Sequence, residues 1–156
     1  MLPAIEKGFA ASPKRSRRFW VEGVGRMQKS EATERLLLEW SKNEDWMVRS
    51  AALCGLVEYE RHLPMLRDIV RRDDDAFVRR ELVKRFGRFT DRATAATVVG
   101  YYADCRRRGD RRGIQEAERT LVRMSKKPAS REGRLINYGL AHWQKWVQTL
   151  PLGGNR

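Results

Sequence analysis

Apolar and polar residues follow one another along the chain with the period of an α-helix. Two segments show this most clearly, because each places an aspartate (Asp45 or Asp75) ahead of apolar residues spaced by four, four and three positions. That spacing puts the apolar side chains on one helical face. An aspartate at the N-cap accepts hydrogen bonds from the free amides of the first turn. The apolar residues are Val48, Ala52, Leu56 and Tyr59 in the first segment, and Val78, Leu82, Phe86 and Phe89 in the second.

The same periodicity predicts helices along the remainder of the chain. Ser12-Pro13 is typical of an N-cap followed by proline in the first turn, and Ser30 and Thr90-Asp91 precede further helices. We expect eight helices in four antiparallel pairs, and pairs of about 30–45 residues that stack side by side make a solenoid. The predicted helices cover residues 13–27, 31–41, 46–59, 63–72, 77–89, 92–105, a segment from 114, and 130–148.

A short motif recurs within this pattern. The sequence Asp-x-x-Val-Arg-x-x-Ala-x-x-x-Leu spans Asp45 to Leu56, and its beginning returns at Asp75, 30 residues later. It resembles the first helix of a HEAT repeat, of the short-period type related to phycobilin-lyase repeats. Copies match at 45–70 and 75–100, although Glu81 departs from the small residue of the family pattern.

The resemblance implies an all-α fold, a right-handed stack of about four antiparallel helix pairs. We expect one HEAT-like domain over 1–150, followed by a disordered tail over 151–156. In repeats of this kind the arginines at the positions of Arg49 and Arg79 pair with an aspartate of a neighbouring turn. Trp20, Trp40 and Trp143 fit apolar helix faces and are predicted core residues, whereas Trp146 is expected to be partly exposed.

Positive charge is concentrated in the second half of the chain. The net charge is +13, but residues 1–78 hold 14 Lys+Arg against 13 Asp+Glu, and residues 79–156 hold 19 against 7. Arginine, which grips phosphate or carboxylate with a planar fork, supplies 25 of the 33 cations. This asymmetry favours an anionic partner: nucleic acid (DNA or RNA), an acidic protein or, less readily, a lipid surface. Genomic base composition also raises arginine content without a functional cause.

The cations fall into local groups that predict a nucleic-acid-binding surface. One group is a helical stripe at Arg80, Lys84 and Arg88, with Arg85 adjacent, and another is an arginine-rich loop at 106–112. A third follows one side of the next helix. The predicted contact residues are Arg80, Lys84, Arg85, Arg88, Arg106, Arg107, Arg108, Arg111, Arg112, Arg119, Arg123, Lys126 and Lys127.

Signatures of catalysis, cofactors and membranes are weak. His62 and His142 have no partner at metal-ligand spacing, and Asp73-Asp74-Asp75 is explained by a turn with an N-cap. We expect no metal, cofactor or membrane span, and a cytoplasmic protein whose Cys54 and Cys105 are reduced thiols. His62 is expected to be exposed, and Gly23 and Gly25 to permit close helix packing.

Three functions remain open. The first is a non-catalytic scaffold or subunit of a nucleic-acid complex, by analogy with small basic helical subunits of bacterial ribonucleoprotein assemblies. The second is an enzyme, since residues 46–53 are similar to a helix of HEAT-like alkylpurine DNA glycosylases. That resemblance implies roles for Trp20, Glu22 and Arg49, although Ser50 replaces a second arginine and the family's next-repeat tryptophan is missing. The third is a protein–protein adaptor without nucleic acid, in which the charge only aids solubility. Separately, an exposed apolar face on the C-terminal helix could dock a partner or a second copy.

Overall fold

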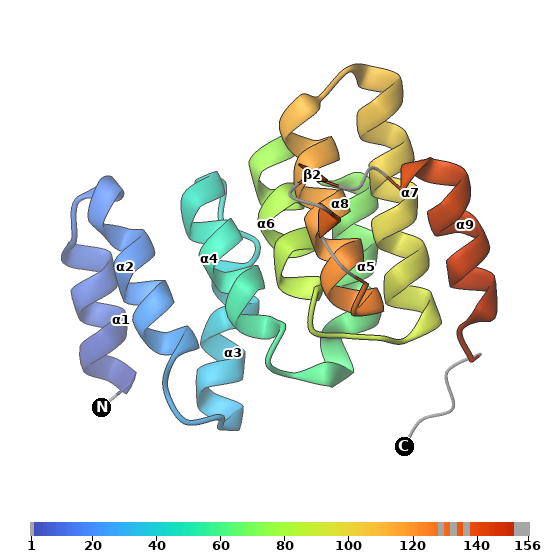
Figure 1. Cartoon of the computed structure of the whole chain (residues 1–156). Helices are drawn as coiled ribbons and strands as arrows, with labels where there is room; N and C mark the ends of the chain where they lie inside the picture. Colours follow the sequence, from blue (N-terminus) through green and yellow to red (C-terminus); the bar gives the residue numbers. More distant parts are fainter. Residues whose placement is uncertain (1, 128–129, 132–133, 136–137, 152–156) are drawn as a thin grey trace. The chain divides into compact units, whose positions relative to one another are not determined.

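A computed structural model describes residues 2–127, 130–131, 134–135 and 138–151 of the chain (Figure 1). Helices make up most of the described residues, and the only strands among them are two residues long, which confirms the all-α fold class. The chain divides into two compact units, Met1–Leu66 and Arg67–Arg156, and each is described by itself. The predicted stack of four helix pairs and the single domain over 1–150 stay predictions.

Unit 1 contains four α-helices, a short 3-10 turn and the start of a fifth helix. Its core is formed mainly where α2 packs on α4 and α4 on α3. A Cβ added to Gly25 would lie 3.3 Å from the Cα of Gly55, so two glycines allow α2 and α4 to approach closely, as predicted for Gly25. Gly23 faces open space instead. The elements are α1 Leu2–Ala11, α2 Lys14–Gly25, α3 Glu31–Trp40, α4 Trp46–Leu56, η1 Glu60–His62 and α5 Leu63–Arg72, which continues into unit 2.

A buried carboxylate ties η1 to α3. The side chain of Glu34 is only 5% exposed and forms an ion pair and hydrogen bonds with Arg61 and His62. Hydrogen bonding from Arg61 holds the pKa of Glu34 below its ordinary value of 4.5, against the opposing effect of burial. The prediction of an exposed His62 is therefore wrong, because its side chain is only 17% exposed and its imidazole contacts the carboxylate of Glu34.

Unit 2 is organised around α7, which contacts both α8 and α9, while α8 also packs on α6. Its core includes Leu82, Phe86, Tyr102, Leu121 and Trp143, each at most 1% exposed. The elements are α6 Ala76–Phe86, α7 Arg92–Arg108, α8 Arg111–Ser125, β1 Ser130–Arg131, β2 Arg134–Leu135 and α9 Gly139–Thr149.

Aspartate caps begin the helices as the sequence predicts. Asp45 accepts a hydrogen bond from the amide of Met47 at 2.9 Å, and Asp75 accepts one from Phe77 at 2.7 Å. Asp91 and Asp110 cap α7 and α8 in the same way. The carboxylate of Asp73 accepts the amide of Asp75, which confirms the turn and N-cap predicted for the acidic run.

Several predicted boundaries were wrong. A helix from Leu2 to Ala11 was not foreseen. The helix predicted to end at residue 89 ends at Phe86, where Gly87 is the C-cap. The predicted loop at 106–112 is shorter, because α7 continues to Arg108 and ends at Gly109, whose φ of 69° suits glycine.

The last helix is shorter than predicted. Residues 130–131 and 134–135 are antiparallel strands, with Ser130 paired to Leu135, and α9 begins at Gly139. Gly139 has a φ of 70°, and a right-handed helix cannot run through that conformation. The predicted tail over 151–156 lies, apart from Pro151, outside the described residues.

Two of the three predicted core tryptophans are buried. Trp40 and Trp143 are 5% and 0% exposed, whereas Trp20 is 38% exposed. The Trp20 indole nitrogen donates a hydrogen bond to the hydroxyl of Ser12 at 2.7 Å, and its ring lies against Gly8 of α1. The unforeseen α1 thus holds Trp20 at the surface of unit 1. Trp146 is partly exposed, as expected.

Candidate nucleic-acid interface

Two helices of unit 2, α6 and α8, lie side by side (Figure 1). Each buries one apolar face, with Val78 and Leu82 inward on α6 and Ala117 and Leu121 inward on α8. A Cβ added to Gly87 would lie 3.1 Å from the Nε atom of Arg123, so the C-terminal ends of the two helices meet. The outward faces therefore form one continuous surface.

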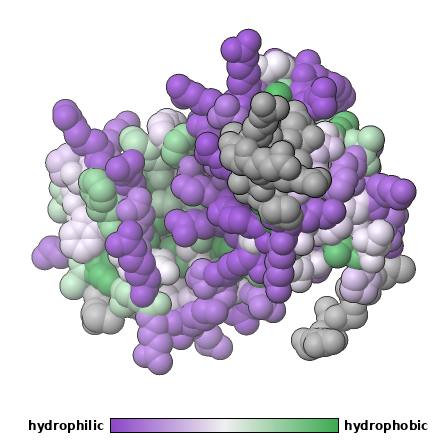
Figure 2. All heavy atoms as spheres, in the orientation of Figure 1, coloured by the Kyte–Doolittle hydropathy of each residue, from purple (hydrophilic) through white to green (hydrophobic). Residues whose placement is uncertain are grey.

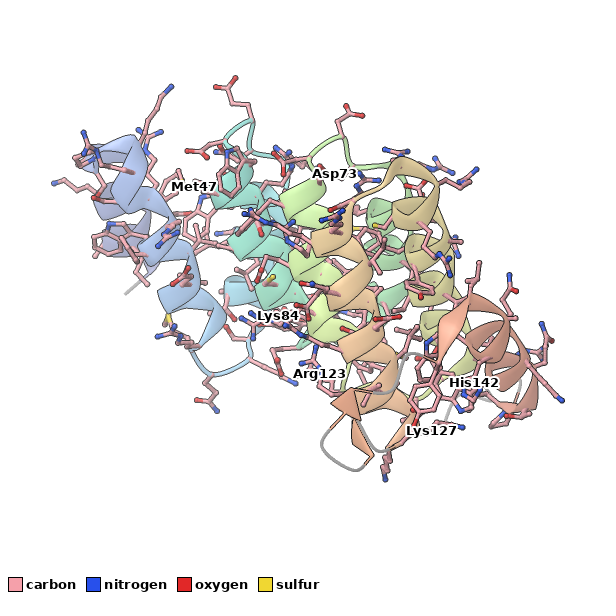
Figure 3. The ribbon with its side chains drawn as sticks, turned by 45° about the horizontal axis from the view of Figure 1, so that its top comes forward. Met47, Asp73, Lys84, Arg123, Lys127 and His142 are labelled. Carbon is pink, nitrogen blue, oxygen red and sulfur yellow. The ribbon has the colours of Figure 1, made fainter. Side chains whose placement is uncertain are left out.

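We call the outward surface of these two helices the basic face. It is defined by Arg80 and Lys84 of α6 and by Arg112, Arg119, Arg123 and Lys126 along α8. At 100° per residue Arg119 and Arg123 each point within about 20° of Arg112, and Lys126 at the C-cap follows the same side. Where Figure 2 leaves the area of α6 visible, its side chains are mostly hydrophilic, and Figure 3 shows Lys84 and Arg123 towards the same ends of their helices.

Carboxylates neutralise the basic face only in part. Glu81 lies 3.9 Å from Lys84, and Glu116 lies 4.0 Å from Arg119 and 3.1 Å from Arg123. Two acids thus pair with three of the six cations, and exposed pairs of this kind are weak. Arg112 and Lys126 make no ion pair with any described residue. The face therefore keeps a net positive charge.

The corner between α7 and α8 holds five of the predicted residues, of which Arg112 also belongs to the basic face. Arg106, Arg107 and Arg108 occupy the last turn of α7, where cations stabilise the helix through its dipole. Arg107 and Arg108 also pair with Asp104, at 3.0 Å and 3.1 Å. Arg111 and Arg112 lie in the first turn of α8 instead, where the dipole opposes a positive charge. Their position costs stability and favours an anionic ligand.

The remaining predicted cations lie beside or beyond the basic face. Arg85 is exposed next to Lys84, further around α6. Arg88 lies past the end of α6, with its guanidinium 4.9 Å from the ring centre of Phe89. The guanidinium of Arg106 lies 6.0 Å from the Tyr102 ring, and Lys127 lies 5.6 Å from the ring of Tyr138. The predicted stripe Arg80–Lys84–Arg88 is thus helical only as far as Lys84, because Gly87 ends α6.

The residues implied by the glycosylase resemblance all lie in unit 1. Arg49 donates hydrogen bonds to the backbone carbonyls of Asn43 and Glu44, at 2.8 Å and 3.2 Å, and so supports the turn before α4. Glu22 lies 4.0 Å from Arg26 of its own helix. Trp20 is held by Ser12, as described above. The glycosylase activity stays a prediction.

The C-terminal helix carries an aromatic cluster that the sequence analysis did not identify as a group. The rings of Tyr138 and His142 lie 4.7 Å apart, and both contact Trp143 at 5.0 Å. Burial lowers the pKa of His142, and the charge of Lys127 lowers it further. The i, i+4 spacing of Tyr138 and His142 was a visible signal for their contact. Docking of a partner or second copy through α9 stays a prediction.

Metal-binding clusters and membrane-spanning helices are both absent from the described residues. Within residues 2–127, 130–131, 134–135 and 138–151, no cluster of three histidines, cysteines or acids is arranged to hold a metal ion. No helix in that part of the chain is long and apolar enough to span a membrane. Comparison of the chain with protein-family models, curated proteins and solved structures finds no match.

Proposed function

We propose that the chain is a non-catalytic binding subunit whose basic face engages the phosphate backbone of a nucleic acid. The observation that carries this proposal is the partly unneutralised row of cations along α8, continued on α6 by Arg80 and Lys84. Lysine and arginine on a helix face bind nucleic acid by displacing the counterions condensed on phosphates. The cost of placing Arg111 and Arg112 in the first turn of α8 is offset by such a ligand.

The geometry supports recognition of the backbone rather than of base sequence. From Arg112 to Lys126 the helix axis rises about 20 Å, so the row can follow several successive phosphates. Arg119 and Arg123 are oriented by Glu116, which fixes the direction of their guanidinium groups. Phosphate contacts position a protein on nucleic acid without reading sequence. We therefore expect binding that tolerates changes of sequence.

We also propose a HEAT-like architecture and a cytoplasmic location, from the capped helices and the two cysteines. The recurrence of capped helices at Asp45 and Asp75 supports a HEAT-like stack of helix pairs. Cys54 and Cys105 form no disulfide, which suits the reducing cytoplasm, where nucleic acids are present.

A salt titration of binding tests the proposed function. Fluorescence anisotropy with labelled 20-nucleotide single strands and duplexes of two unrelated sequences should give the same affinity within about threefold for both sequences. If all six cations of the basic face contact phosphate, the logarithm of the binding constant should fall with the logarithm of salt concentration. The expected slope is about −4 for single strands and about −5 for duplexes. A slope near zero, or no binding at low salt, would contradict a backbone interface.

A further inference from the structure

A second basic feature of unit 2 is a cleft between α5 and α7, with a volume of 310 Å³. Its floor is the surface of α7 at Gly100, where an added Cβ would meet no atom within 4 Å. The backbone is therefore open to a ligand at this point. The cleft is lined by Val70, Arg71, Ala96, Thr97, Gly100, Tyr101, Asp104, Arg107 and Arg108.

Asp104 gathers arginines from two helices at one end of this cleft. Its carboxylate lies 3.0 Å from Arg107, 3.1 Å from Arg108 and 3.5 Å from Arg79. Arg79 comes from α6, and its side chain is only 10% exposed. Its Nε–H has no hydrogen-bond partner among the described residues. On the opposite wall, Arg71 of α5 donates a hydrogen bond to the hydroxyl of Thr97 at 3.3 Å.

The charges in the cleft do not balance without a ligand. Three arginines and a single carboxylate line the cleft, and the buried Arg79 pairs with the same carboxylate. Each guanidinium has five N–H donors in a planar fork. Arg107 and Arg108 are 79% and 62% exposed, so most of their donors remain available. Metal cations are repelled by this arrangement, and an apolar ligand would leave the donors unused. A compact anion with several oxygens fits the donors best.

We propose that this cleft binds a phosphate monoester, held by Arg71, Arg107 and Arg108. A monoester carries a charge of about −1.5 to −2 and three strong acceptor oxygens, more than the single charge of an internal phosphodiester. Asp104 is a positioning residue, because it pairs with Arg107 and Arg108 and so aligns their guanidinium groups. The inference does not rest on the proposed function, since the cleft lies between α5 and α7 and the basic face lies on α6 and α8.

The phosphate has two sources that share this chemistry. A volume of 310 Å³ is at the lower end of the range for small-molecule sites, so a phosphorylated metabolite fits. A 5′-phosphorylated end of a nucleic-acid strand presents the same group. If the ligand is a metabolite, Arg107 and Arg108 bind a molecule other than the nucleic acid. If it is a strand end, they contact the 5′ end of the nucleic acid that the predicted binding surface engages.

Binding of matched ligands with and without the phosphate tests the proposal and separates the sources. One arm measures AMP against adenosine by calorimetry, and the other measures a 5′-phosphorylated oligonucleotide against the same oligonucleotide with a 5′-hydroxyl. We expect at least a tenfold preference for the phosphate in at least one arm. A preference for AMP alone indicates a small molecule, and a preference in the oligonucleotide arm indicates a strand end.

Two double variants test whether the cleft is responsible for the preference for phosphorylated ligands. The double variant Arg71→Gln, Arg107→Gln should abolish the preference, whereas Arg15→Gln, Arg35→Gln in unit 1 should preserve it. All four side chains are exposed, and circular dichroism verifies that both variants fold. Equal binding of phosphorylated and unphosphorylated ligands in both arms overturns the proposal, as does a preference that survives the cleft variant. Loss of salt-dependent oligonucleotide binding alone would contradict the proposed function instead.

Discussion

The triple variant Lys84→Glu, Arg112→Glu, Lys126→Glu is expected to bind nucleic acid about 100-fold more weakly than the unaltered protein at low salt. Each change removes a cation from the basic face and adds a charge that repels phosphate. The three side chains are exposed, and Arg112 and Lys126 make no ion pair with the described residues. Folding should therefore be preserved, with the helical circular-dichroism signal unchanged, while anisotropy records the loss of affinity.

A charge-matched variant controls for net charge. Lys14→Glu, Lys29→Glu, Lys42→Glu lowers the net charge by the same amount, but its three exposed lysines lie in unit 1. We expect this control to lose less than about fivefold in affinity, through long-range electrostatics alone. Equal losses in the two variants would show that overall charge, rather than the basic face, determines binding.

Gly113→Ala is expected to lower the free energy of unfolding by about 1–3 kcal/mol. Gly113 lies in the first turn of α8, where an added Cβ would lie 2.4 Å from the sulfur of Cys105 and 2.5 Å from a carboxylate oxygen of Asp110. Asp110 caps α8 by accepting the amide of Gly113 itself, so it cannot move without losing that hydrogen bond. Cys105 is buried, and its burial raises the pKa of the thiol. The substitution therefore separates α7 from α8.

Gly100→Ala is the matched control, because the same substitution in the middle of α7 meets no atom within 4 Å. Alanine is a better helix former than glycine by about 1 kcal/mol, so this variant should be more stable than the unaltered protein. Urea unfolding followed by circular dichroism measures both. Stabilisation by both alanines would contradict the close packing of α7 on α8.

Local sequence signals predicted the features that local chemistry determines. An aspartate before an apolar stripe was sufficient to predict the caps at Asp45 and Asp75, because a cap depends on residues within one helical turn. Arg119, Arg123 and Lys126 were predicted on one side of a helix for the same reason, whereas Arg112 was predicted in a loop and lies in the first turn of α8.

Features that depend on distant residues were not predicted. Glu34 is paired with residues 27 and 28 positions away, and no pattern near it indicates that partner. Asp104 stands beside a run of arginines, and its role in gathering Arg79 appears only once α6 and α7 pack together. The predicted start of the last helix was wrong because Gly139 adopts a positive φ, and sequence periodicity alone does not reveal that conformation.

Lysine acetylation with and without bound nucleic acid tests the central claim most directly. Lys84 and Lys126 on the basic face, Lys29 and Lys42 in unit 1, and Lys145 on α9 are all exposed and therefore reactive in the unbound protein. Quantitative mass spectrometry should show that a saturating oligonucleotide slows modification of Lys84 and Lys126 at least fivefold and leaves the other three nearly unchanged. Uniform modification of all five lysines, or protection confined to unit 1, would mean that α6 and α8 do not form the interface.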